Sequence, residues 1–378
     1  VVSGSRVWET VTGREVARLT HAPYDAAFSP DGRYVVSGSW DTTARVWEAD
    51  TGREVARMTH DGEVLAVAFS PDGRLVVSGS WDGTVRVWEA ASGREVARMT
   101  HNNWVDAVAF SPDGRFVVSR GCDRAVYANC TKSTARVWEA ASGRELARMI
   151  HGDYVTAVAF SPDGQYVVSG GCDKRDGSTC IEGTARVWEA DTGREVARMT
   201  YNGEVLAVAF SPDGRLVVSG GCDGRDVHGL CTRSTVRVWE ADTGREVARM
   251  TYDGEVIAVA FSPDGRLVVS GGCDGRNVYY EGCPKSTARM WEMASGREVA
   301  RMIHDDKVIA VTFSPDGQYV VSGSEDGTVR VWEAASGHEA TCMTHDSTVE
   351  PVAFSPDGRF VVSGSWDTTA RVWEADTG

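Results

Sequence analysis

One short segment recurs along this 378-residue chain and constrains its fold more than any other feature. The turn Phe-Ser-Pro-Asp-Gly occurs eight times, with its proline at Pro30, Pro71, Pro112, Pro162, Pro212, Pro263, Pro315 and Pro356. A tryptophan recurs nine times, at Trp8, Trp47, Trp88, Trp138, Trp188, Trp239, Trp291, Trp332 and Trp373. Where the repeat is plain, successive tryptophans lie 41 residues apart. Such a period predicts a fold in which one supersecondary unit is used many times.

A single copy of the repeat reads as four antiparallel strands. Pro71 and Gly73 supply the φ angles of a tight turn, and Asp82-Gly83 is a two-residue hairpin signal. Between these turns the residues are valine-rich or alternate between apolar and polar, as strands do. The expected strands are Glu63–Ser70, Arg74–Trp81, Thr84–Glu89 and Arg94–Thr100. Four strands in about 40–45 residues are typical of a propeller blade.

With these motifs the chain resembles the WD40-repeat family over essentially its whole length. In this chain the Trp-Asp pair that names the family is Trp-Glu. The resemblance implies an all-β propeller of eight four-stranded antiparallel blades. It also implies that the fourth-strand segment Arg14–Thr20 completes the last blade and closes the ring, because Val349–Glu374 supplies only three strands. We therefore expect residues 1–13 to be a leftover partial repeat and residues 14–378 to form one propeller domain.

Four blades contain an insertion between their second and third strands, and each insertion brings two cysteines. The pairs are Cys122/Cys130, Cys172/Cys180, Cys222/Cys231 and Cys273/Cys283. The spacing favours four local disulfides, each closing a ring of about ten residues and worth roughly 2.5 kcal/mol. Two alternatives are metal binding, for which this spacing is unsuited, and buried reduced cysteines. Disulfides would indicate an extracellular or periplasmic location. The ninth cysteine, Cys342, is expected to be a free thiol.

The blades also combine a histidine, a serine, an aspartate and the tryptophan, except that blades 5 and 6 have Tyr201 and Tyr252 at the histidine position. Blade 2 has His60, Ser78, Asp82 and Trp88, and blade 8 has His345, Ser363, Asp367 and Trp373. A Ser/His/Asp set suggests a hydrolase, but eight identical active sites around a ring would be unusual. By resemblance to WD40 proteins, these residues form a structural hydrogen-bond chain. We therefore expect no enzyme activity, no cofactor and no metal site.

Aromatic residues mark one face as the candidate binding surface. By resemblance, the residue before the hairpin aspartate commonly contacts partners, and here it is Trp40, Trp81 or Trp366 in three blades and Glu325 in another. The residues that enter the first strands add Tyr24, Trp104, Tyr154 and Glu63. Exposed aromatic clusters are typical of interfaces. The alternative is that each tryptophan only covers its own hairpin.

Charge narrows the class of partner. The chain has 39 basic and 54 acidic residues, a net charge of −15, and no dense Lys/Arg cluster of the kind that binds phosphate backbones. No apolar run is long enough to span a membrane. The favoured function is a non-catalytic platform for a protein or peptide. The alternative is a structural repeat protein whose copies assemble into a surface lattice or filament.

Overall fold

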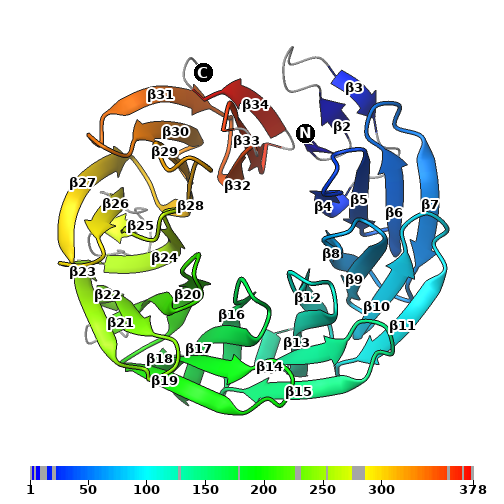
Figure 1. The fold of residues 1–378 in the computed structure, drawn as a ribbon, viewed down its shortest axis with the longest axis horizontal. Coiled ribbons are helices and arrows are strands. Elements are labelled where there is room, and N and C mark those ends of the chain that lie inside the picture. Colours follow the sequence, from blue (N-terminus) through cyan, green and yellow to red (C-terminus); the bar gives the residue numbers. More distant parts are fainter. Residues whose placement is uncertain are drawn as a thin grey trace. The chain divides into compact units, whose positions relative to one another are not determined.

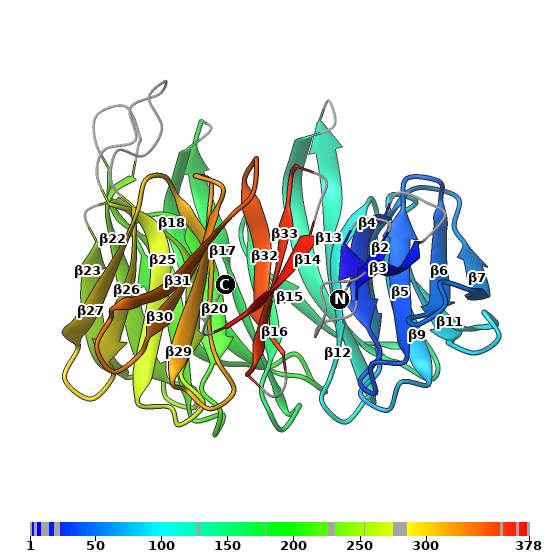
Figure 2. The ribbon, with the colours of Figure 1, turned by 90° about the horizontal axis from the view of Figure 1, so that it is seen from above.

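The computed structural model describes residues 2–3, 6–8, 15–18, 23–126, 129–177, 179–225, 231–252, 254–274, 286–355, 358–367 and 370–375. All regular structure in these ranges is β-strand (Figures 1 and 2). They contain no helix that could cross a membrane. The chain divides into two compact units, Val1–Val167 with Trp188–Glu195 (unit 1) and Val168–Val187 with Val196–Gly378 (unit 2).

Unit 1 holds an N-terminal three-stranded sheet and the first three blades, and in every sheet the strand order follows the chain. The N-terminal sheet comprises β1 (Val2–Ser3), β2 (Arg6–Trp8) and β3 (Glu15–Arg18). Blade 1 comprises β4 (Pro23–Phe28), β5 (Tyr34–Ser39), β6 (Thr43–Glu48) and β7 (Glu54–Thr59). Blade 2 comprises β8 (Val64–Phe69), β9 (Leu75–Ser80), β10 (Thr84–Glu89) and β11 (Glu95–Thr100). Blade 3 comprises β12 (Val105–Phe110), β13 (Phe116–Val126), β14 (Asn129–Glu139) and β15 (Glu145–Ile150).

The boundary between the units falls within blade 4, and blades 5 to 8 belong to unit 2. Blade 4 comprises β16 (Tyr154–Phe160), β17 (Tyr166–Asp176), β18 (Thr179–Glu189) and β19 (Glu195–Tyr201). Blade 5 comprises β20 (Val205–Phe210), β21 (Leu216–Arg225), β22 (Cys231–Glu240) and β23 (Glu246–Tyr252). Blade 6 comprises β24 (Gly254–Phe261), β25 (Leu267–Asp274), β26 (Ser286–Glu292) and β27 (Arg297–His304). Blade 7 comprises β28 (Val308–Phe313), β29 (Tyr319–Ser324), β30 (Thr328–Glu333) and β31 (Glu339–Thr344), and blade 8 comprises β32 (Val349–Phe354), β33 (Phe360–Ser365) and β34 (Ala370–Glu374).

The Ser-Pro-Asp-Gly turn joins the first two strands of a blade. In blade 2, Ser70 Oγ donates to Asp72 Oδ1 at 2.6 Å and accepts the N–H of Leu75 at 2.9 Å. Gly73 has φ of 70°, which glycine adopts without the steric cost that a side chain adds. These local bonds fix the turn and set the register of the two strands.

The long blades differ from the plain ones in their second and third strands. In blade 3, β13 and β14 have 11 residues each, whereas β9 and β10 of blade 2 have 6. The extra residues continue the antiparallel pairing beyond the position where the plain hairpin turns. The insertion is therefore an extension of the sheet, and in unit 1 it rises above the plain hairpins (Figure 2).

The core lies where successive sheets pack face to face. Between blades 2 and 3, Val77, Val87 and Val105 are fully buried with Trp138, which is 3% exposed. Burial of each such side chain contributes roughly 1.5–3 kcal/mol. Gly79 allows the close approach, because a Cβ there would lie only 2.8 Å from Cγ1 of Val105.

The chain ends differ from the prediction. Glu15–Arg18, within the segment Arg14–Thr20, pairs with Arg6–Trp8, and the sheet of blade 8 ends at β34 in the described residues. The predicted pairing of this segment with the last blade is therefore wrong. β2 has the same Arg-Val-Trp sequence as a third strand and lies close by in the chain, so the local hairpin costs little closure entropy. The division into 1–13 and 14–378 stays a prediction.

Candidate binding face

A hydrogen-bond chain runs through blade 2 from its third-strand tryptophan to the loop before its first strand. Trp88 Nε1 donates to Ser78 Oγ at 2.8 Å, and that oxygen lies 2.7 Å from His60 Nε2. His60 Nδ1 lies 3.2 Å from Asp82 Oδ2. This order assigns the Nδ1 proton to the Asp82 contact and leaves Nε2 to accept from the serine hydroxyl. Ser78 is completely buried and bonded on both sides, so no substrate carbonyl can approach it.

The environment of this chain shifts two pKa values. Burial lowers the pKa of His60, against the opposing effect of the Asp82 carboxylate. Burial alone would raise the pKa of Asp82, but hydrogen bonds from His60, from Thr84 and from the backbone N–H of Asp61 hold it well below its usual range. Asp82 is therefore an anion that accepts several bonds at once. Its role is to fix the hairpin and the adjoining loop.

The same arrangement recurs in blade 8. Trp373 Nε1 lies 2.9 Å from Ser363 Oγ, which lies 2.8 Å from His345 Nε2. His345 Nδ1 lies 3.0 Å from Asp367 Oδ2. The repeated geometry supports a structural role for the set.

A buried arginine in the third strand also binds the hairpin aspartate, and sequence reasoning missed it. In blade 2 the Arg86 side chain is 5% exposed, and its Nη2 lies 3.0 Å from Asp82 Oδ2. In blade 3, Arg136 is 3% exposed and lies 2.6 Å from Asp123. The signal was present, because an arginine stands two residues before most of the tryptophans. It was hidden by the expectation that charged residues of a strand face solvent.

In blade 3 the chain of contacts is interrupted. His101 Nε2 still lies 2.8 Å from Ser119 Oγ, which accepts the Trp138 indole N–H at 2.7 Å. His101 Nδ1, however, is buried without a hydrogen-bond partner. Burial, with a smaller effect from Arg136, lowers the pKa of His101 to about 3. The aspartate of this hairpin, Asp123, contacts Arg136 and forms no bond to the histidine Nδ1.

Blades 5 and 6 carry tyrosine in place of this histidine. Tyr201 OH lies 2.8 Å from Ser219 Oγ, which also accepts the Trp239 indole N–H at 3.0 Å. The Arg237 guanidinium lies over the Tyr201 ring, 4.2 Å from its centroid. Tyrosine thus keeps the bond to serine and needs no carboxylate, since its ring packs against the arginine.

Three tryptophans of the predicted face are strongly exposed. Trp40, Trp81 and Trp366 are 60%, 46% and 72% exposed, whereas the third-strand tryptophans are mostly buried. Trp81 stacks on Trp104, with ring centroids 4.7 Å apart and planes 10° apart. Trp81 N–H donates to the Glu63 carbonyl at 2.8 Å, so the main chain fixes the base of this side chain.

The remaining predicted contact residues are less uniform. Tyr154 and Glu63 are half-buried, and the Tyr24 side chain lies outside the described residues. Glu325 is exposed, and partial burial raises its pKa, with Lys307 opposing and the nearby acids Asp306, Glu255 and Glu350 reinforcing the effect. Blade 7 therefore offers an acidic position where blade 2 offers an aromatic one.

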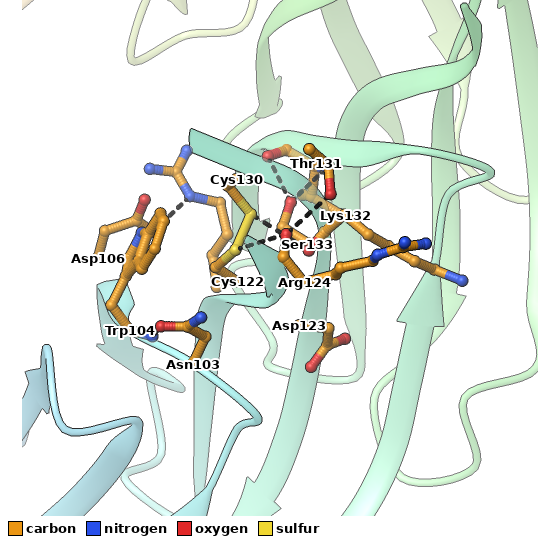
Figure 3. Close-up of a disulfide and its surroundings, with 12 residues drawn as sticks. Asn103, Trp104, Asp106, Cys122, Asp123, Arg124, Cys130, Thr131, Lys132 and Ser133 are labelled. Atoms are coloured by element: carbon orange, nitrogen blue, oxygen red, sulfur yellow. Dashed lines mark hydrogen bonds and ion pairs between the residues drawn. A yellow bond between two sulfur atoms is a disulfide. The ribbon is translucent and has the colours of Figure 1, made fainter. Parts of the chain in front are cut away.

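Three of the predicted cysteine pairs are disulfides: Cys122–Cys130, Cys172–Cys180 and Cys222–Cys231, with Cα atoms 5.7–5.9 Å apart. Figure 3 shows the first of them at the base of the blade 3 insertion, with Trp104 beside it. The fourth predicted pair cannot be placed, because Cys283 lies outside the described residues. Cys342 is free and exposed. In the described ranges, no group of three or more His, Cys, Asp or Glu residues is placed to hold a metal ion.

The model of the WD domain, G-beta repeat family matches this chain eight times, over residues 13–48, 52–89, 93–139, 144–189, 195–225, 247–278, 297–333 and 337–374. The chain belongs to the WD40-repeat family. Its fold is the all-β, eight-bladed WD40 propeller, and the family typically serves as a protein-interaction platform and is generally non-catalytic.

Individual relatives match only in part. WD repeat-containing protein 18 of Danio rerio is 30% identical over 94 residues, 24% of this chain and 22% of that protein. Eukaryotic translation initiation factor 3 subunit I of Phaeosphaeria nodorum is 32% identical over 101 residues, 25% of this chain and 29% of that protein. The chain thus spans less than a third of these relatives. The crystal structure of the computationally designed Ika8 protein is similar over 96% of this chain and 100% of that one, with TM-score 0.71 and 31% identity.

Proposed function

We propose that this WD40 domain is a non-catalytic platform that binds a protein or peptide through the loops carrying Trp40, Trp81 and Trp366. The observation that carries the proposal is the exposure of these three tryptophans at one position of the repeat. A large apolar ring left in water at repeated positions is typical of an interface anchor. The Trp81–Trp104 stack adds a rigid, partly exposed aromatic surface in unit 1.

Packing within the blade does not require an aromatic residue at this position. Blade 7 has Glu325 there, and its N–H donates to the Lys307 carbonyl at 2.9 Å as Trp81 N–H donates to Glu63. The hairpin therefore forms with either side chain. This comparison supports a binding role for the tryptophans.

The disulfide hairpins of the long blades support an extracellular or periplasmic location. Disulfides persist in oxidising compartments and are rare in the cytosol. Three of them, each within one hairpin, restrict the loops that a partner would contact. Restricted loops lose less conformational entropy on binding.

The test is capture of partners from extracts of the native source, followed by affinity measurement on the captured protein. The double variant Trp81→Ala, Trp366→Ala should bind about tenfold more weakly or worse, because central aromatics each contribute more than ~1–2 kcal/mol. Glu325→Ala is the matched control at the same position and should change affinity little. Wild-type affinity of the double variant, or capture only of further copies of the chain through other surfaces, would contradict the proposal and favour a lattice.

A further inference from the structure

The disulfide hairpin of blade 3 holds two cations directly opposite each other. Arg124 on β13 and Lys132 on β14 are Cα partners in the strand register, and both side chains are exposed. Figure 3 shows them extending from the hairpin on the side away from Trp104. Like charges at directly opposed positions repel and destabilise a sheet. The stability of the sheet therefore does not explain why two cations occupy these opposed positions.

No carboxylate of the described residues neutralises the charges of Arg124 and Lys132. The nearest acid of the hairpin, Asp123, is already bound to the buried Arg136 at 2.6 Å. Neither Arg124 nor Lys132 forms an ion pair with a described residue, whereas Arg86 and Arg136 each pair with carboxylates. Two positive charges are thus left for solvent or for a ligand.

The hairpin is built to keep these cations in place. The Cys122–Cys130 disulfide joins the two strands beside them, with Cα atoms 5.7 Å apart. The Thr131 hydroxyl donates to the Arg124 carbonyl at 3.1 Å and fixes the backbone between the strands. A fixed backbone reduces the entropy that a partner must remove on binding.

The geometry points to Arg124 and Lys132 as an anion clamp for an acidic peptide segment, and this inference rests on the proposed function because it names the partner chemistry. A guanidinium and an ammonium on adjacent strands can each take one side-chain carboxylate or share one, through charge-assisted hydrogen bonds. The net charge of −15 repels a polyanion, so a continuous phosphate backbone is disfavoured relative to a short acidic segment.

Blade 5 supplies a matched control within the same chain. In the described part of its disulfide hairpin, Arg233 is exposed and has Gly224 as its strand partner, while the neighbouring Arg225 is half-buried. Arg233 therefore has the same kind of location without the opposed second charge. Loss of Arg233 should leave the clamp intact.

The experiment selects peptides from a random twelve-residue phage library on the full oxidised chain and measures their affinity by fluorescence anisotropy. The selected peptides should be rich in Asp and Glu. Arg124→Gln with Lys132→Gln should weaken the binding of these peptides about tenfold, because the ion pairs of both cations with the peptide are lost. The salt dependence of binding should fall as well, while Arg233→Gln should leave both unchanged.

Other outcomes separate the two hypotheses. Selected peptides without acidic enrichment, or equal affinity of the Arg124/Lys132 variant, would overturn the clamp. If Trp81→Ala still abolishes binding in that case, the proposed function stands without it. If acidic peptides depend on the cations but not on the tryptophans, the clamp stands and the aromatic site fails. Tighter binding of a single-stranded oligonucleotide than of the selected peptides would also overturn the inference.

Discussion

Blades 2 and 3 are copies of one repeat, but the aspartate of the hairpin between the second and third strands makes different contacts in each. In blade 2, Asp82 contacts both His60 and the buried Arg86. In blade 3, the pairing of β13 and β14 continues past this point, and Asp123 contacts Arg136 while His101 Nδ1 has no partner. The comparison shows that one carboxylate in blade 2 serves both the histidine and the arginine, whereas in blade 3 the carboxylate contacts the arginine and the histidine Nδ1 has no partner.

The tyrosine blades show how the same difficulty is avoided. Tyr201 and Tyr252 bond to the buried serine of their blades and lie under an arginine, so neither depends on the aspartate. Blade 3 instead combines a histidine with a long hairpin.

The strongest test of this comparison removes the aspartate from each blade in turn. Asp82→Ala removes the acceptor for His60, Thr84 and the Asp61 N–H and leaves the buried Arg86 without its nearest anion. We expect a loss of about 3–5 kcal/mol in the free energy of unfolding, as for other broken buried pairs. Urea unfolding followed by tryptophan fluorescence measures it.

The matched change, Asp123→Ala in blade 3, should cost clearly less. It removes the bond to Arg136, but Arg136 still has the Glu145 carboxylate at 3.4 Å. No hydrogen bond of His101 Nδ1 is lost, because that atom has no partner. If the two variants lost the same free energy of unfolding, the aspartate would contribute equally in both blades, and the comparison would be refuted.

A smaller effect is expected from opening the disulfide. Cys122→Ser with Cys130→Ser removes a cross-link over a sequence separation of 8 residues. The chain-entropy model gives a loss of about 2.5 kcal/mol. Hydrogen exchange of the β13–β14 amides should then accelerate, while exchange in β9–β10 stays constant. Cys342→Ser is the control, because that thiol is free and exposed; unchanged exchange in the double variant would contradict a stabilising role for the bridge.

The smallest expected effect comes from giving blade 3 the residue of blades 5 and 6. His101→Tyr should stabilise the protein by about 1–2 kcal/mol near neutral pH, because it removes a buried polar atom without a partner. The ring has a suitable place, since Gly121 lies against His101 as Gly221 lies against Tyr201. A loss of stability would show that the histidine has a partner in solution.

The His101→Tyr variant should also change how the free energy of unfolding depends on pH. The pKa of His101 is about 3 in the folded chain and 6.5 as its ordinary value. Between these values the unfolded chain binds a proton that the folded chain does not, so this histidine makes stability fall as pH drops from 6.5 towards 3. His101→Tyr should lose less stability than the wild type between pH 7 and pH 4. Parallel curves for the two proteins would show that His101 is not buried as a neutral base.

The sequence predicted the features of the fold that depend on repeated motifs and on the spacing of cysteines. The eight Ser-Pro-Asp-Gly turns located the blades, and the cysteine spacing located Cys122–Cys130 and its two counterparts. It did not predict the pairing of Glu15–Arg18, because two segments with nearly the same sequence compete for that strand. The stack of Trp81 on Trp104 was also not predicted, since it depends on loop conformations that pattern alone does not specify.

Most second strands have a glycine after their buried serine, whereas blade 3 has Arg120 there, and this glycine has a consequence for how such a chain can change its length. Gly38, Gly79, Gly220 and Gly271 each face a valine of the following blade at a distance that leaves no room for a Cβ. Each of these interfaces between blades is therefore formed by the same two residue types, a glycine and a valine. If the gene gains or loses one whole repeat, the two blades that become neighbours still present this glycine and this valine to each other. They can therefore pack as the original blades do. Growth by whole blades needs no new interface, whereas a single substitution such as Gly79→Ala disturbs an interface at once.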